Sequence, residues 1–279
     1  MNALGLAVAA RLRSYAPQLY AKSVSVTRFL ETHMALVGLA WLLMAGSLSA
    51  WRLLNPAAPV HKFGDIQLDV VAYAIVVSAP VLGFLVAVMA SRSTMLALPA
   101  SLQFALWKRW HPLAPQEART RHNFGAFGFL ASLLVGLLLN VVIRTLEFIA
   151  AVPAMGAHAP AWGRTLFNLM AVDVALTGFF YMVAFVMALR TLPLFPRMLG
   201  FVWLLDITMQ LYIARQIGRI ADAPDFVVGP LGDLLHGNIM KVLISMLVWL
   251  PYLLLSERVN ITYRHRTETP PVGEIPDGD

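Results

Sequence analysis

Apolar residues follow one another in six long runs, and charged residues gather in the stretches between them. A helix that spans a bilayer needs about 20 consecutive, predominantly apolar residues, and each run approaches or exceeds that length. Each run is therefore predicted to be a transmembrane helix. The predicted spans are Met34–Leu54, Val70–Ala90, Ala126–Ala151, Leu166–Leu189, Met198–Ala214 and Asn238–Leu255.

The segments that flank these spans alternate between rich and poor in Lys and Arg. Fourteen of the 21 basic residues lie before the first span or after the second, fourth and sixth, and five lie on the opposite face. Because cytoplasmic loops carry the excess of Lys and Arg, this alternation predicts an even number of crossings with both termini in the cytoplasm. The expected fold class is all-α: a polytopic integral membrane protein with six transmembrane helices.

The segments outside the spans are predicted to lie at the membrane surface or in water. Residues 1–33 carry Leu and Val at helical spacing beside basic residues, which fits either an amphipathic helix on anionic lipid or a disordered segment. The basic loop 91–123 contains an apolar stretch, 95–107, that is too short to cross and is expected to be an interfacial helix. Residues 265–279 are rich in Pro, Glu, Asp and Thr, and we expect them to be disordered.

The basic loop divides the chain into two predicted parts. Residues 34–90 form a two-span hairpin, and residues 124–264 form a four-span bundle with short connections. The third span is expected at the core of this bundle, because small residues recur at every fourth position and would let another helix approach closely. These helix-packing positions are Gly128, Ser132 and Gly136.

Polar side chains recur inside the last four spans, where a charge is costly and usually faces the protein interior. Arg144 and Glu147 are three residues apart, and Asp206 and Gln210 are four apart, so each pair is predicted to share a helix face and interact. The predicted intramembrane cluster, in the outer half of the membrane, is Asn140, Arg144, Glu147, Asp173, Asp206, Gln210 and Lys241. It is either a structural network that fixes helix pairing, or a polar cavity that binds or conducts a proton, an ion or an anionic headgroup.

Composition and motifs narrow the classes of function. The chain has no Cys, which excludes disulfides, iron–sulfur clusters and thiol nucleophiles. Its seven His are scattered without metal-ligand spacing, and it has no P-loop, GxGxxG, GxSxG or HExxH motif. No catalytic residue, metal or cofactor is therefore assigned. The net charge of +6 is attributed to cytoplasmic loops rather than to nucleic-acid binding.

The end of the last span carries a short motif, VWLPYLLLSERVNITY, over residues 248–263. It resembles the closing signature of the domain-of-unknown-function family 2569, in which a Trp-x-Pro-Tyr helix end leads into Ser-x-Arg-Val-x-x-Thr-Phe. The matching positions are Trp249, Pro251, Tyr252, Ser256, Arg258, Val259, Thr262 and Tyr263, where Tyr replaces the final Phe. The resemblance covers the part 124–264 and implies a small four-helix bacterial inner-membrane protein of unassigned activity.

The sequence favours a non-enzymatic accessory or scaffold component of the bacterial inner membrane. Its expected partners are the lipid bilayer and other membrane proteins, with a homo-oligomer also open. A small transporter or channel that uses the polar cluster is the alternative, and an intramembrane enzyme acting on lipid is the third interpretation. A water-accessible cavity that reaches Asp206 would favour transport, whereas a closed and fully paired cluster would favour scaffolding.

Overall fold

The computed structural model describes residues 3–92, 110–219 and 224–268, with side chains described from residue 17 onward and not at residue 225. In this part of the chain, six helices are long and apolar enough to cross a bilayer. They are α1 (Ala3–Leu54), α2 (Gln67–Ala90), α5 (Phe129–Ala151), α6 (Ala161–Leu189), α7 (Phe195–Ile217) and α8 (Asp225–Leu255). The predicted all-α fold with six candidate spans is confirmed.

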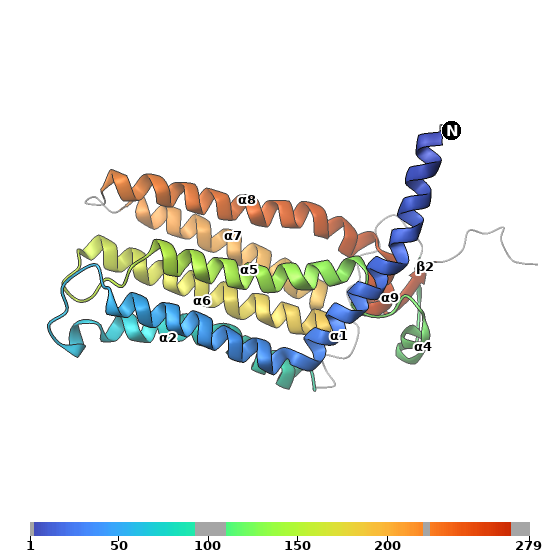
Figure 1. The fold of residues 1–279 in the computed structure, drawn as a ribbon, viewed down its shortest axis with the longest axis horizontal. Coiled ribbons are helices and arrows are strands. Elements are labelled where there is room, and N and C mark those ends of the chain that lie inside the picture. Colours follow the sequence, from blue (N-terminus) through green and yellow to red (C-terminus); the bar gives the residue numbers. More distant parts are fainter. Residues whose placement is uncertain (1–2, 93–109, 220–223, 269–279) are drawn as a thin grey trace, which may run out of the picture.

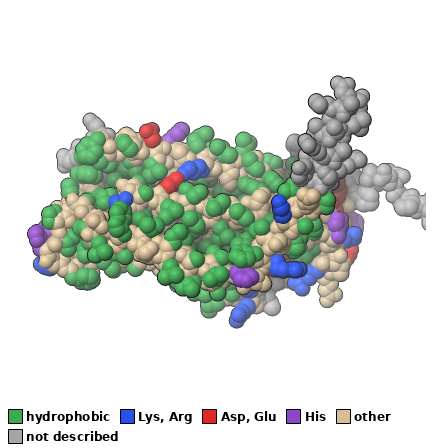
Figure 2. Space-filling model, in the orientation of Figure 1, with side chains coloured by type: hydrophobic (Ala, Val, Ile, Leu, Met, Phe, Trp, Pro, Cys, Tyr) green, Lys and Arg blue, Asp and Glu red, His purple; other side chains and the backbone are tan. Residues whose placement is uncertain are grey.

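The six helices run side by side along the long axis of the molecule (Figure 1). Figure 2 shows a mostly hydrophobic surface along their length, with Lys, Arg and His side chains gathered toward the two ends. Such an apolar band between polar ends is the surface that a bilayer requires.

Several helices differ from the predicted spans at their ends. The start of α5 lies at Phe129 rather than Ala126, because Gly125 and Gly128 have φ angles of +113° and +66° that a right-handed helix cannot contain. The start of α8 lies at Asp225 rather than Asn238. Hydropathy marks only the part of a helix that suits lipid, whereas backbone hydrogen bonding continues beyond it.

The helix α1 is much longer than the predicted first span, since it begins at Ala3. It bends at His33, where φ is −115° and ψ is 16°, and its first part leaves the bundle (Figure 1). This supports the helical interpretation over the disordered one for residues 3–33. Its placement on anionic lipid stays a prediction, and the expected interfacial helix 95–107 lies outside the described residues.

The helix at the centre of the bundle is α6, which packs against α2, α5 and α7. The pair α2 and α6 is the most extensive, and Gly83 permits it: a Cβ there would lie 2.4 Å from the carbonyl oxygen of Phe179. The prediction that the third span forms the core is therefore wrong. The predicted two-span hairpin and four-span bundle pack together, and both contribute residues to each of two hydrophobic clusters.

The row of small residues on the third span does not form a close helix pairing along its length, and only its first member, Gly128, bonds to another helix, α1. Gly128 precedes α5, and its N–H donates to Ser23 Oγ (2.8 Å). Ser132 and Gly136 are exposed, and a Cβ on Gly136 would meet nothing within 4 Å. Their predicted packing role is wrong because sequence spacing identifies a helix face but not what that face meets.

One end of the bundle carries short elements: α4 (Pro115–Thr120), α9 (Glu257–Arg264) and the antiparallel strands β1 (Trp110–Pro112) and β2 (Arg266–Glu268). A 3-10 turn, η1 (Phe63–Asp65), lies in the loop between α1 and α2. The predicted disorder from residue 265 is wrong for 266–268. Arg266 lies over the Trp110 ring at 4.9 Å, a contact between distant segments that composition cannot show.

Candidate functional site

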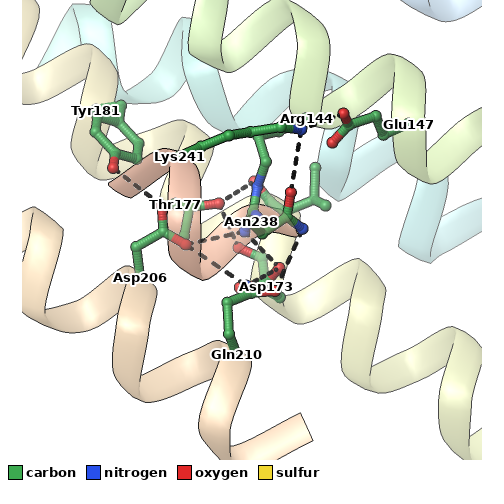
Figure 3. Close-up of polar contacts among 10 residues, drawn as sticks. Arg144, Glu147, Asp173, Thr177, Tyr181, Asp206, Gln210, Asn238 and Lys241 are labelled. Atoms are coloured by element: carbon green, nitrogen blue, oxygen red, sulfur yellow. Dashed lines mark hydrogen bonds and ion pairs between the residues drawn. The ribbon is translucent and has the colours of Figure 1, made fainter. Parts of the chain in front are cut away.

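A buried salt-bridge network joins α5, α6 and α7 in the interior of the bundle (Figure 3). Arg144 Nη2 donates to Asp173 Oδ2 at 2.8 Å and to Asp206 Oδ1 at 3.1 Å. The three side chains are 6%, 4% and 1% exposed. One guanidinium nitrogen therefore ties together three helices that are distant in the sequence.

Hydrogen bonds satisfy every oxygen of the two buried carboxylates. Gln210 Nε2 donates to both oxygens of Asp173 at 3.0 Å and to Asp206 Oδ1 at 3.5 Å. The Tyr181 hydroxyl donates to Asp206 Oδ2 at 2.9 Å. Buried carboxylates persist in proteins when they are paired and hydrogen-bonded in this way, although Arg144 Nε has no partner among the described residues.

A second ion pair extends the network to α8. Lys241 Nζ donates to Glu147 Oε1 at 2.5 Å and to Asn238 Oδ1 at 3.4 Å. Asn238 Nδ2 in turn donates to Gln210 Oε1 at 3.3 Å, which connects the Lys241–Glu147 pair to the buried charges around Arg144. Unlike those buried charges, the Lys241 and Glu147 side chains are accessible, at 51% and 29% exposed.

The structure brings together most of the predicted cluster but changes its pairing. The predicted Arg144–Glu147 pair is wrong, because aspartates from two other helices bind the guanidinium and Glu147 binds Lys241 instead. The predicted contact of Asp206 with Gln210 is confirmed. Asn140 lies on α5, and its amide nitrogen has no partner among the residues that the structure describes.

Three members of the network were not predicted: Thr177, Tyr181 and Asn238. Thr177 Oγ1 donates to the backbone oxygen of Asp173 at 2.7 Å, one helical turn before it. Asp173, Thr177 and Tyr181 recur at every fourth position of α6, so they share one face. The sequence signal for these residues is their four-residue spacing from Asp173. It does not stand out, because Thr and Tyr are common in apolar helices.

The aromatic residues of the closing motif fasten the end of α8 to the start of α5. The ring of Phe129 stacks on Trp249 at 4.6 Å and meets Tyr252 edge-on at 5.0 Å. Pro251 lies inside α8, and the Ser256 N–H donates to the carbonyl of Tyr252 at the helix end. These contacts give this part of the motif a packing role.

The remainder of the motif, on α9, is held against other segments. The Tyr263 hydroxyl donates to the Ala188 carbonyl at 2.8 Å, and the Gly125 N–H donates to Thr262 Oγ1 at 3.0 Å. Arg258 reaches Asn123 Oδ1 at 3.4 Å, while Val259 is fully buried. Burial also lowers the pKa of the neighbouring Arg264 to about 10.

A separate polar contact links two loops at the opposite end of the bundle. Asp65 Oδ2 accepts the backbone N–H groups of His61 and Lys62 at 3.1 and 3.2 Å, and His158 Nε2 lies 3.5 Å away. The His61 N–H is the main cause that lowers the pKa of Asp65, and desolvation opposes it. This contact joins the two loops. No group of three or more His, Cys, Asp or Glu side chains that could hold a metal ion occurs in the described part of the chain.

Comparison of the chain with protein-family models, with curated proteins and with solved structures gave no match. The resemblance to the domain-of-unknown-function family 2569 therefore stays a prediction.

Proposed function

We propose that this chain is a non-enzymatic accessory or scaffold component of a membrane. We further propose that its buried network holds the helices in one relative rotation and register. The observation that carries the proposal is the closure of the network. Asp173 and Asp206 are 4% and 1% exposed, and all four carboxylate oxygens are paired. A path for ions or protons needs such groups in contact with water, so closure supports a structural role.

The geometry of the network explains how it would select one arrangement of helices. A shift of α7 by one residue rotates Asp206 by about 100° around the helix axis and removes it from Arg144. An apolar core tolerates such slips more readily, because contacts between aliphatic side chains are not directional. The network thus supports a rigid frame that presents constant outer surfaces.

The outer surfaces are suited to lipid and to other transmembrane helices. Of the candidate spans, α8 and α1 bury the smallest share of the residues in their most apolar stretch. Large exposed side chains follow both helices, among them Leu39, Leu43, Phe226 and Leu247. Exposed apolar surface of this extent is typical of sites that lipid or another protein covers.

The membrane proposed for this protein is the bacterial inner membrane, with both termini in the cytoplasm. The excess of Lys and Arg beside α4 and α9 supports this orientation through the positive-inside rule. Reporter fusions at Met1 and Asp279 test it. A periplasmic signal at either end would contradict the proposed orientation.

The accessory role is tested by copurification from native membranes in a mild detergent, followed by mass spectrometry. Recurrent partners at fixed stoichiometry support the proposal, and a monodisperse protein without any partner contradicts it. Arg121→Gln is a matched control, because it alters only an exposed ion pair at 50% and 49% exposure. Arg144→Met should lose the partners that Arg121→Gln retains.

One observation favours the alternative of a small transporter. Two carboxylates share a single guanidinium, so the buried trio carries one negative charge in excess when all three groups are ionised. A bound proton or cation would neutralise that charge. Ion or proton flux into proteoliposomes that Asp206→Asn abolishes would establish transport in place of scaffolding.

A further inference from the structure

The ion pair between Lys241 and Glu147 lies on the outside of the bundle, within the predicted sixth span. Lys241 is near the middle of α8, with about 20 Å of helix on each side at 1.5 Å per residue. Figure 2 shows basic and acidic side chains next to each other within a mostly hydrophobic face, over α5 and α8. Charged groups at bilayer depth are usually shielded from lipid by protein. In this structure half of the Lys241 side chain is unshielded.

The helix that carries Lys241 is also the one most open to a neighbour. Among the spans, α8 packs extensively only against α7. Gly237 precedes Lys241 by four residues, and a Cβ there would meet nothing within 4 Å. A small residue one turn away lets a second helix approach closely beside the ion pair.

The ion pair is complementary to a second copy of itself. Two copies inserted in the same direction are related by a two-fold axis along the membrane normal, which preserves depth and reverses every direction in the membrane plane. Lys241 and Glu147 lie on different helices at a shared depth, so the dipole between them runs across the helices. The axis therefore places two antiparallel dipoles together, with each Lys facing the Glu of the other copy.

The hydrogen-bonding capacity of the pair agrees with this arrangement. Lys241 has three N–H donors and uses two, on Glu147 Oε1 and Asn238 Oδ1. Glu147 Oε2 is buried within its own copy and has no partner among the described residues, so it is not an acceptor that a second copy can reach directly. One donor therefore remains on Lys241, and a neutral pair adds no net charge to an interface.

We propose that the face formed by α5 and α8 around Lys241 and Glu147 is an interface between two copies of this chain in the membrane. The proposal is independent of the accessory role, because a dimer can form whether or not other proteins bind. In this dimer the exposed ion pair fixes the position of one copy relative to the other.

The absence of Cys allows a direct test with single-Cys variants of the full chain in native membranes. Ile244→Cys lies one turn from Lys241 and is 57% exposed, and the control Ile75→Cys lies on α2 with 52% exposure. A short bis-maleimide should join two copies through residue 244 and leave the control monomeric. Both variants retain the ion pair, so neither depends on the tolerance of the network to substitution.

Three outcomes of the cross-linking experiment contradict the proposal. They are no dimer through residue 244, equal dimer through residue 75, and an adduct of residue 244 with a different protein. The last of these would still support the accessory role, so failure of one proposal is distinguishable from failure of the other.

Charge reversal tests the part played by the ion pair. Lys241→Glu leaves two acids on each copy and Glu147→Lys leaves two bases on each copy, so each variant alone should lose at least about tenfold in cross-linked dimer. When the two variants are expressed together, the acidic copy faces the basic copy and the mixed dimer should reappear. Mixed dimers no more abundant than the weakened homodimers, in variants that insert and purify normally, would overturn the role of the pair.

Discussion

Arg144→Met is expected to be the most destabilising single substitution in the network. It leaves Asp173 and Asp206 facing each other in the interior, with only Gln210 and Tyr181 as donors. Removal of one partner from a buried ion pair costs about 3–5 kcal/mol, because the remaining charge stays buried without compensation. In the equilibrium between folded and unfolded protein this corresponds to a factor of roughly 10² to 10³ or more.

The size of the effect follows from burial rather than from the number of contacts. The three charged side chains are at most 6% exposed, so solvent screens little of the uncompensated repulsion. Arg121→Gln breaks the half-exposed pair with Glu117 and should cost less than about 1 kcal/mol. A triple variant that adds Asp173→Leu and Asp206→Leu to Arg144→Met should recover much of the loss, since no charge is then left buried.

Reversible unfolding in mixed micelles, followed by Trp fluorescence, would measure these differences in free energy. The decisive comparison is the ranking of the variants by free energy of unfolding. Arg144→Met should be least stable, the triple variant intermediate, and Arg121→Gln close to the native chain. If Arg144→Met were within about 1 kcal/mol of the native chain, the carboxylates would have another source of neutralisation and the reasoning from closure would be refuted.

Three further substitutions test separate parts of the structure. Gly83→Ala should destabilise by about 1–3 kcal/mol because its Cβ would overlap the backbone of α6, whereas Gly46→Ala, with open space around it, should be neutral or slightly stabilising in the same unfolding assay. Tyr263→Phe should cost about 0.5–1.5 kcal/mol, because it removes one donor to the buried carbonyl of Ala188, which also accepts the Thr191 N–H, and an unchanged stability would show that water replaces the hydroxyl. Asp65→Asn should reduce stability at pH 7 and match the native chain in strong acid, as thermal inactivation at a series of pH values can show. The folded pKa of Asp65 lies below the unfolded value, so its contribution is present above about pH 4 and lost as the pH falls through the lowered pKa. A gap between Asp65→Asn and the native chain that widened in acid would contradict that sign.

The existence of the spans could be predicted from sequence because lipid imposes it. Every hydrocarbon-facing helix must be long and apolar, and the runs that became α2, α5 and α6 meet that demand visibly. The helix boundaries were less predictable. The helix α8 extends into polar sequence and begins at Asp225, and the positive φ angle of Gly128 delays the start of α5.

The members of the charge network could be predicted, and their partners could not. Charged residues in spans stand out in any sequence, so Arg144, Asp173, Asp206 and Lys241 were found. Pairing depends on how the helices are rotated against α6, and the local spacing of Arg144 and Glu147 could not reveal that two aspartates from other helices lie closer. The same missing rotation explains why Gly136 was expected inside, whereas Gly83 makes the close helix contact.

The most direct test of a closed network is the reactivity of a Cys placed inside it. Thr177 is 1% exposed and lies one turn from Asp173, and Thr177→Cys adds the only thiol in the chain. His61→Cys, in an exposed loop, provides the fully reactive reference. With a small water-soluble maleimide applied to permeabilised membranes, a closed network predicts rapid labelling at residue 61 and labelling at residue 177 only after denaturation. Labelling of residue 177 in the folded protein at a rate near that of residue 61 would mean that water reaches the carboxylates, and it would contradict the structural role.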